Sequence, residues 1–131
     1  MKINLLVIGI ILLFASCDPV KGIEFINKTD SSVDVIMALD TNSVYYKQER
    51  FENEMISDTN SIVITIEGNN TMSFYLGMGN WSEDELKLFA RSMKKLEIIT
   101  KEKTTSYDSA ESIYELLHSS QINRSVQIEI E

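Results

Sequence analysis

Apolar and polar side chains alternate in several short segments of the chain, which is the two-residue period of half-buried β-strands. The alternation is clearest in residues 33–39, where Val33, Val35, Met37 and Leu39 occupy every second position. Similar alternation or a high content of β-branched residues predicts further strands at residues 23–27, 44–46, 62–66, 72–76, 96–99 and 126–130.

Polar turns separate the predicted strands. Residues 28–32 join the first two strands, and we expect these two to form a hairpin. Residues 68–70 (Gly-Asn-Asn) tolerate positive φ, which predicts a second hairpin between the strands on either side of them. The polar residues 47–57 carry only isolated apolar positions, and their pattern leaves a short helix and an ordered loop both open.

The first of two predicted helices spans about residues 82–93. Ser82 and Glu85 form a capping box at its start. Gly77 and Gly79, just before the helix, match two thirds of a dinucleotide-binding loop, but the third glycine of that motif is missing. We therefore expect these glycines to provide a tight turn that leads into the helix.

A second capping box, formed by Asp108 and Glu111, predicts a helix over about residues 109–119. The predicted order is then five strands, a helix, a strand, a helix and a final strand. This order indicates the α+β class. We expect a mostly antiparallel sheet of about six to seven strands, with the two helices of the C-terminal half packed on one face.

The first 16 residues have the pattern of a signal peptide. Lys2 provides positive charge, residues 3–14 are almost entirely apolar, and Ala15 and Ser16 are small. A helix of the apolar residues 3–14 would be about 18 Å long, whereas a bilayer core is roughly 30 Å thick. This length favours a cleaved signal peptide over a membrane span.

The segment Phe14-Ala15-Ser16-Cys17 resembles the lipobox of bacterial lipoproteins, in which the cysteine carries acyl chains and becomes the new N-terminus. The resemblance implies that Cys17 is lipidated, and two or more acyl chains anchor a protein stably. We then expect a location in the cell envelope, at the inner or the outer membrane. The alternative is a secreted protein with an unmodified cysteine near its cleavage site.

These patterns divide the chain into three parts. Residues 1–16 are the predicted signal peptide, residues 17–22 are the lipidated cysteine and a short tether, and residues 23–131 are a single domain. Removal of the signal peptide leaves 131 − 16 = 115 residues, which is the usual size of one domain.

Composition excludes several classes of function. A single cysteine and a single histidine cannot form an intramolecular disulfide or a zinc site, and we expect no cofactor. After residue 16 there are 20 acidic and 11 basic residues, a formal charge of −9. Such a domain repels phosphate backbones, so we expect no binding to nucleic acid. The same charge favours a basic protein partner.

The candidate partner-binding residues combine aromatic and acidic side chains between positions 45 and 54. Aromatic side chains can form a stacking surface, although burial in the core is their commoner role in a small domain. An acidic segment usually forms a solvated face and can also meet a basic partner. The candidates are Tyr45, Tyr46, Glu49, Glu52 and Glu54.

Two further residues, His118 and Ser109, have side chains that could take part in chemistry. His118 is the only histidine, and the sequence places no identifiable nucleophile and acid around it, so we expect it to act as a charge near a helix C-terminus. Ser109 follows Asp108 and precedes Ala110, a pattern that resembles the O-glycosylation acceptor of Bacteroidota envelope proteins. It is a candidate modification site as well as part of the predicted helix start.

The order of motifs resembles the small lipoproteins of unknown function that are abundant in Bacteroidota. The segments that carry the resemblance are F-I-N-K-T-D-S-S-V, W-S-E-D-E-L, K-K-L-E-I-I and Y-D-x-x-E-S-I-Y-E-L, in that order. The chain departs from the family pattern in its longer Lys101–Ser106 segment and its acidic C-terminus. The resemblance implies lipoprotein processing and a compact domain, and it transfers no catalytic residue.

We therefore expect a lipid-anchored, non-enzymatic binding or assembly module, with the membrane and a protein as its partners. One alternative is an envelope immunity protein that neutralises a toxin. Another is a small carboxylate-dependent glycan hydrolase, which would need two carboxyl groups in one cleft, with raised pKa values.

Overall fold

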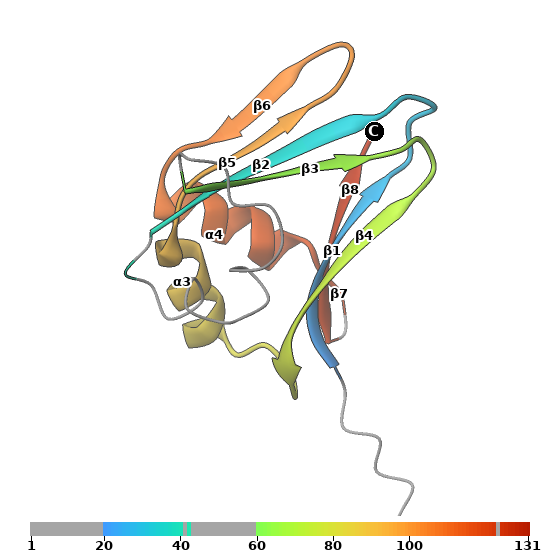
Figure 1. The fold of residues 1–131 in the computed structure, drawn as a ribbon. Coiled ribbons are helices and arrows are strands. Elements are labelled where there is room, and N and C mark those ends of the chain that lie inside the picture. Colours follow the sequence, from blue (N-terminus) through green and yellow to red (C-terminus); the bar gives the residue numbers. More distant parts are fainter. Residues whose placement is uncertain (1–19, 41, 43–59, 123) are drawn as a thin grey trace, which may run out of the picture.

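The computed structural model describes residues 20–40, 42, 60–122 and 124–131, and Figure 1 shows their arrangement. Two helices and eight strands are described, which places the fold in the predicted α+β class. In chain order they are β1 (Val20–Asn27), β2 (Val33–Leu39), β3 (Ser61–Ile66), β4 (Thr71–Met78), α3 (Glu83–Ser92), β5 (Met93–Ile99), β6 (Thr104–Tyr107), α4 (Ala110–Ser119), β7 (Gln121–Ile122) and β8 (Ser125–Ile130).

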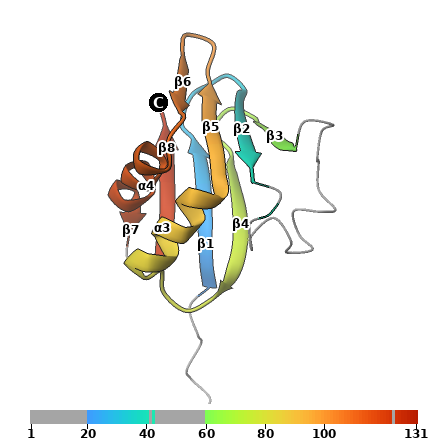
Figure 2. The ribbon, with the colours of Figure 1, turned by 90° about the vertical axis from the view of Figure 1, so that its left-hand side faces the viewer.

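The strands form two sheets, and the expectation of a single sheet of six to seven strands is wrong. Sheet A has the order β4-β1-β8-β7, and sheet B has the order β3-β2-β5-β6. All pairs are antiparallel except β1 with β8, which run parallel. The sheets converge near the β1–β2 and β3–β4 turns and diverge towards the helices (Figures 1 and 2).

Neither predicted hairpin forms. β1 pairs with β4, placing Phe25 opposite Met72, whereas β2 pairs with β3, placing Val35 opposite Ile64. Each predicted turn therefore carries the chain from one sheet to the other. The hydrophobic alternation identified the strands, but it does not distinguish a hairpin from a turn between two facing sheets, since both bury one face of each strand.

Asn27 explains why the chain changes sheets at the end of β1. Its buried side-chain Nδ2 donates to the carbonyl oxygens of Ser31, Ile66 and Glu67 at 2.8, 2.9 and 3.1 Å. Its Oδ1 accepts from the backbone N–H of Thr29 at 2.9 Å and from the Thr29 hydroxyl at 2.8 Å. One amide thus satisfies backbone groups of both turns where ladder hydrogen bonds are lost.

The two turns also touch at Gly68. A Cβ at this position would lie 2.6 Å from the backbone carbonyl carbon and oxygen of Asp30, too close for any side chain. The following Asn69 adopts positive φ, as predicted for this turn, and its backbone N–H donates to the Thr29 carbonyl at 3.0 Å. Close approach of the backbones, rather than positive φ, is what requires glycine at position 68.

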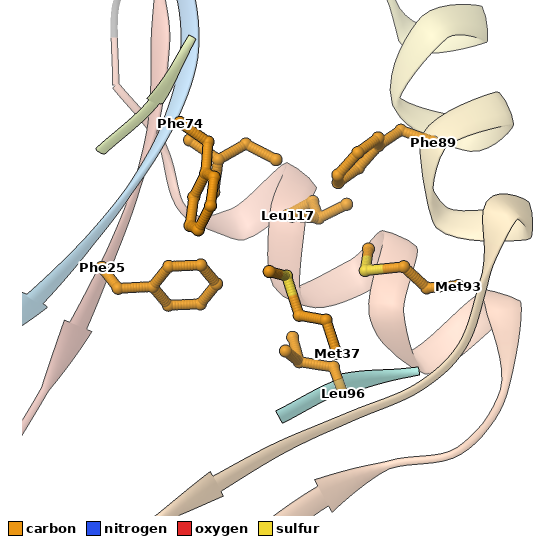
Figure 3. Close-up of a pocket in the computed structure, with 8 residues that line it drawn as sticks. Phe25, Met37, Phe74, Phe89, Met93, Leu96 and Leu117 are labelled. Atoms are coloured by element: carbon orange, nitrogen blue, oxygen red, sulfur yellow. The ribbon is translucent and has the colours of Figure 1, made fainter. Parts of the chain in front are cut away.

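The hydrophobic core fills the wedge between the diverging sheets. α4 packs against β5 of sheet B and β8 of sheet A, and α3 packs against α4. Figure 3 shows Phe25 and Phe74 of sheet A pointing towards Phe89 and Met93, with Leu117 of α4 among them. A void of about 10 Å³ remains among these apolar side chains. It is no larger than one water molecule and has no polar lining group, so it is a packing gap and not a ligand site.

The helix boundaries differ in detail from the prediction. The capping box of Ser82 and Glu85 is confirmed at the start of α3. At α4 the cap is Ser109, whose side chain accepts from the backbone N–H of Ser112, so the prediction of Asp108 with Glu111 is wrong by one residue. A serine hydroxyl accepts this bond as well as a carboxylate does, and sequence alone does not separate the two adjacent caps.

Candidate functional site

Most of the predicted site residues lie outside the described residues. These are Cys17, Tyr45, Tyr46, Glu49, Glu52 and Glu54. Their roles in lipidation and in partner binding therefore stay predictions. Ser109 is described and is exposed, but its hydroxyl is already used, because it caps α4 and lies 3.0 Å from the Ser112 hydroxyl.

Trp81 serves the core and not a stacking surface. Its ring is buried, its Nε1–H donates to the Gly22 carbonyl at 3.0 Å, and its centroid lies 5.8 Å from that of Phe89. This aromatic side chain is therefore part of the core. Gly77 and Gly79 before it both have positive φ, as the predicted tight turn requires.

His118 lies exposed in the last turn of α4, as predicted. Its ring packs on Tyr114, with centroids 5.5 Å apart. Neither a serine hydroxyl nor a carboxylate within the described ranges forms a hydrogen bond or ion pair with it. This arrangement gives no support to a nucleophilic site.

The carboxyl groups with perturbed titration are all shifted downward. The side-chain hydrogen bond from Lys21 and the backbone N–H of Ser82 lower the pKa of Glu85 to about 2. Lys87, at 2.6 Å, lowers the pKa of Glu83. For Glu97 the pKa is lowered by Lys95 at 2.8 Å, and also by the Ser106 hydroxyl. Each shift favours the ionised form near neutral pH, so none of these three carboxyl groups has the raised pKa that the hydrolase alternative requires.

Two hollows that are open to solvent lie together at the end of the molecule where β8 finishes. One, of about 290 Å³, lies between the β1–β2 turn and the β5–β6 turn. The other, of about 170 Å³, lies between β6 and the end of β8, and both are lined by Thr100 and Glu131. We call the second hollow the strand-edge groove. It is also lined by Ile98, Lys103, Thr105, Tyr107, Glu129 and Ile130.

One wall of the strand-edge groove is built by the β5–β6 turn. The backbone N–H of Thr100 donates to the Lys103 carbonyl at 2.9 Å, which closes a two-residue loop. The Thr100 hydroxyl accepts from the backbone N–H groups of Glu102 and Lys103 at 3.3 and 3.1 Å. The sequence indicated a polar loop here and missed β6, because its short Thr-Thr-Ser-Tyr segment lacks an apolar alternation.

The opposite wall is an open edge of β8. On the side that faces β1, the Ile130 carbonyl accepts a hydrogen bond from the backbone N–H of Lys28. On the opposite side, the backbone N–H of Gln127 donates to the Ser120 carbonyl. Backbone groups of a strand alternate between its two neighbours, so those of Glu129 point away from β1. β7 pairs only with Ser125 and Val126, and it does not reach this residue.

β6 presents a second open edge. Closure of the turn at Thr100 and Lys103 makes Ile98 and Thr105 the next hydrogen-bonded pair of the hairpin. The backbone N–H and C=O groups of Thr104 and Ser106 consequently point away from β5. β6 has no partner other than β5 among the described strands. Within the described part of the chain, the groove is therefore flanked by backbone groups of both sheets that have no partner strand.

Comparison with protein-family models, with curated proteins and with solved structures finds no match to this chain. In the described part of the chain, no helix is long and apolar enough to cross a membrane. The same residues contain no cluster of three histidine, cysteine or acidic side chains suited to a metal ion. The site must therefore be judged by its own geometry.

Proposed function

We propose that the chain is a lipid-anchored module of the bacterial cell envelope that binds an extended segment of a protein partner in the strand-edge groove. The observation that carries the proposal is the pair of open strand edges, at Glu129 of β8 and at Thr104 and Ser106 of β6, on either side of one groove. An extended peptide supplies the complementary N–H and C=O groups along its whole length.

The side chains of the groove suit such a segment. Ile98 and Ile130 are buried and Tyr107 is half-buried, so together they offer an apolar floor. Lys103, Glu129 and Glu131 are exposed charged residues around it. Alternate side chains of a bound strand would face this floor and the solvent in turn, which gives selectivity for apolar residues at every second position.

The chain as a whole favours a basic partner. Its formal charge is −8, and complementary charge speeds encounter between proteins. The two neighbouring hollows are lined by two lysines and four acidic residues, so their surroundings are acidic like the chain as a whole; the acidic residues are Asp30, Glu102, Glu129 and Glu131. We therefore assign the attraction to the acidic charge of the whole molecule, the groove included, and the selectivity to the apolar floor of the groove.

The position of the groove supports this role. β1 starts at Val20 and runs about 25 Å to Asn27, beside which β8 ends in parallel. Figure 1 shows the start of β1 at one end of the domain and the β5–β6 turn and the C-terminus at the other. With a lipid on Cys17, the groove would lie at the end of the domain away from the anchor.

Two variants of one residue test the groove. Glu129→Pro removes the N–H that points off the edge of β8, and its ring hinders an added strand. Glu129→Thr keeps the N–H and loses the same side chain, including its ion pair with Lys28 at 2.6 Å. Each variant is used for a quantitative pull-down from detergent-solubilised envelope.

We expect a single protein to be recovered with the wild type and with Glu129→Thr, and to be lost with Glu129→Pro. Equal recovery with both variants would show that the edge of β8 is not the binding site. The absence of any enriched protein with the wild type would contradict the binding function itself. If the partner is a toxin whose activity the chain blocks, the protein is an immunity factor and not an assembly subunit.

The anchor has its own test. Wild-type cells fed a fatty-acid probe should label the chain, and the Cys17→Ala variant should not be labelled. Labelling of the variant would refute lipidation at Cys17, whatever the outcome at the groove.

A further inference from the structure

Exposed apolar side chains gather at one end of sheet A. The described residues include six large hydrophobic side chains that are exposed, and four of them lie at the end where β1 starts. These four are Met78, Tyr75, Val20 and Ile122, with exposed fractions of 74%, 53%, 52% and 47%. We call them the apolar end of sheet A.

The strand register brings these residues to one level of the sheet. Val20, the first residue of β1, is paired with Met78, the last residue of β4, and Gly22 is paired with Tyr75. On the other side of β1, Ile23 is level with Val126, and Ile122, the last residue of β7, is paired with Ser125 at the same end. Figure 1 shows the starts of β1 and β8 and the end of β4 together.

The backbone around Met78 exposes it further. Gly77 and Gly79 on either side have φ of +145° and +102°, and a Cβ at either glycine would meet no atom within 4 Å. The Met78 side chain therefore stands on an open corner and not in a crevice. Exposure of this methionine side chain to water is unfavourable in free energy, and contact with an apolar phase would remove its apolar surface from water.

The position of Cys17 in the sequence indicates that this apolar phase is a lipid bilayer. Cys17 precedes Val20 by three residues, which span at most about 11 Å even when fully extended. With acyl chains on Cys17, the start of β1 cannot move further than this from the residue embedded at the bilayer surface. We propose that the apolar end of sheet A rests on the lipid bilayer at the boundary of headgroups and acyl chains; this inference depends on the lipid anchor of the proposed function.

The charges at this end are compatible with a lipid surface. Arg124, in the β7–β8 turn, is exposed and can contact lipid phosphates. The first turn of α3 carries three carboxylates: Glu83 is paired with Lys87 and Glu85 with Lys21, whereas the exposed Asp84 forms no ion pair with the described residues. These pairs reduce the repulsion from anionic headgroups. A second contact beside the lipid would fix the orientation of the domain, with the strand-edge groove directed away from the membrane.

Depth measurements with spin labels test the contact directly. The processed, lipidated chain with Met78→Cys is labelled with a nitroxide and reconstituted into vesicles of phosphatidylethanolamine and phosphatidylglycerol. Val63→Cys is the matched control, because Val63 is also an exposed apolar residue on a strand, but it lies in sheet B. Ile122→Cys provides a second probe if Met78→Cys proves unstable. The accessibility of each label to oxygen and to a water-soluble nickel chelate is measured.

We expect the label at position 78 to lose most of its accessibility to the chelate and to gain accessibility to oxygen on reconstitution, while the label at position 63 stays accessible to the chelate. Equal accessibility of both labels to the chelate, in protein that sediments with the vesicles, would overturn the contact and leave the anchor intact. Protein that stays in solution and reacts with the label at Cys17 would refute the anchor, and the contact would fail with it.

Discussion

At the scale of single residues, Asn27 is one of only two polar residues that are buried among the described residues, the other being Ser92. Asn27 is fully buried, and its amide joins the two turns through five hydrogen bonds. We expect Asn27→Ala to destabilise the domain by about 2–4 kcal/mol, because several buried backbone groups would lose their hydrogen-bond partner. Urea unfolding monitored by circular dichroism measures the free energy of unfolding.

Asn70→Ala is the matched control for that experiment. Asn70 lies in the adjoining turn with an exposed side chain, and its contact with β1 is made by its backbone carbonyl, which accepts from the Asn27 N–H. We expect a change within about 0.5 kcal/mol. Similar losses for both variants would mean that the turn, and not the buried amide, determines the stability of this corner.

Glu85 links stability to pH at the same scale. Its pKa of about 2 in the folded protein lies below its ordinary value of 4.5, so protonation favours the unfolded state. The contribution of Glu85 is therefore complete above about pH 5 and is lost as the pH falls towards 2. We expect the difference in free energy of unfolding between wild type and Glu85→Gln to shrink over this range.

The control for the pH experiment is Glu115→Gln, an exposed glutamate in the middle of α4. Glu115 forms no ion pair with the described residues, so its variant removes the same charge without breaking such a contact. If the Glu85→Gln difference changed with pH no more than the Glu115→Gln difference does, neither Lys21 nor Ser82 would stabilise the carboxylate of Glu85 in solution.

At the scale of elements, the cap of α4 can be separated from the candidate modification at the same residue. Ser109→Ala removes the side chain that accepts from the Ser112 N–H and should cost about 1 kcal/mol. Ser109→Asp keeps a good cap without a hydroxyl, so its stability should equal that of the wild type. Thermal unfolding of the three proteins measures the effect.

The mass of the intact protein tests whether Ser109 is glycosylated. If Ser109 is glycosylated in its own cells, the wild type should exceed the mass of chain plus lipid, and neither variant should. A wild-type mass equal to chain plus lipid would refute the modification, and the cap would remain the whole role of Ser109.

The elements also show how far the sequence predicts this fold. Each described strand with clear alternation, such as residues 33–39, was placed within a few residues of its bounds, because burial of one face selects that pattern. The pairing of β1 with β4 and of β2 with β3 was not predictable from the sequence. The buried amide of Asn27 bonds to both turns where the chain changes sheets, and nothing in the sequence distinguishes this asparagine from one in an ordinary turn. β6 was missed for lack of apolar residues, and the groove with it.

At the scale of the whole molecule, α4 holds the two sheets apart. Leu117 is buried between them beside the void of about 10 Å³, so Leu117→Ala would enlarge an existing gap. We expect a loss of about 2–5 kcal/mol in a single cooperative transition. Leu88→Ala, on the exposed face of α3, should change the stability by less than about 0.5 kcal/mol. Separate transitions for the two sheets would contradict a shared core.

The net charge of −8 acts at the same scale, on encounter with the partner and not on the fold. The association rate constant for a basic partner should fall as salt concentration rises, because screening shortens the range of attraction. Lys101→Gln and Lys94→Gln remove the same charge, but Lys101 lies beside the groove and Lys94 at the opposite end of β5. At low salt we expect Lys101→Gln to raise the rate constant more than Lys94→Gln. Equal effects would place the approach elsewhere on the acidic surface, and a lower rate constant for Lys101→Gln would identify an acidic partner segment instead.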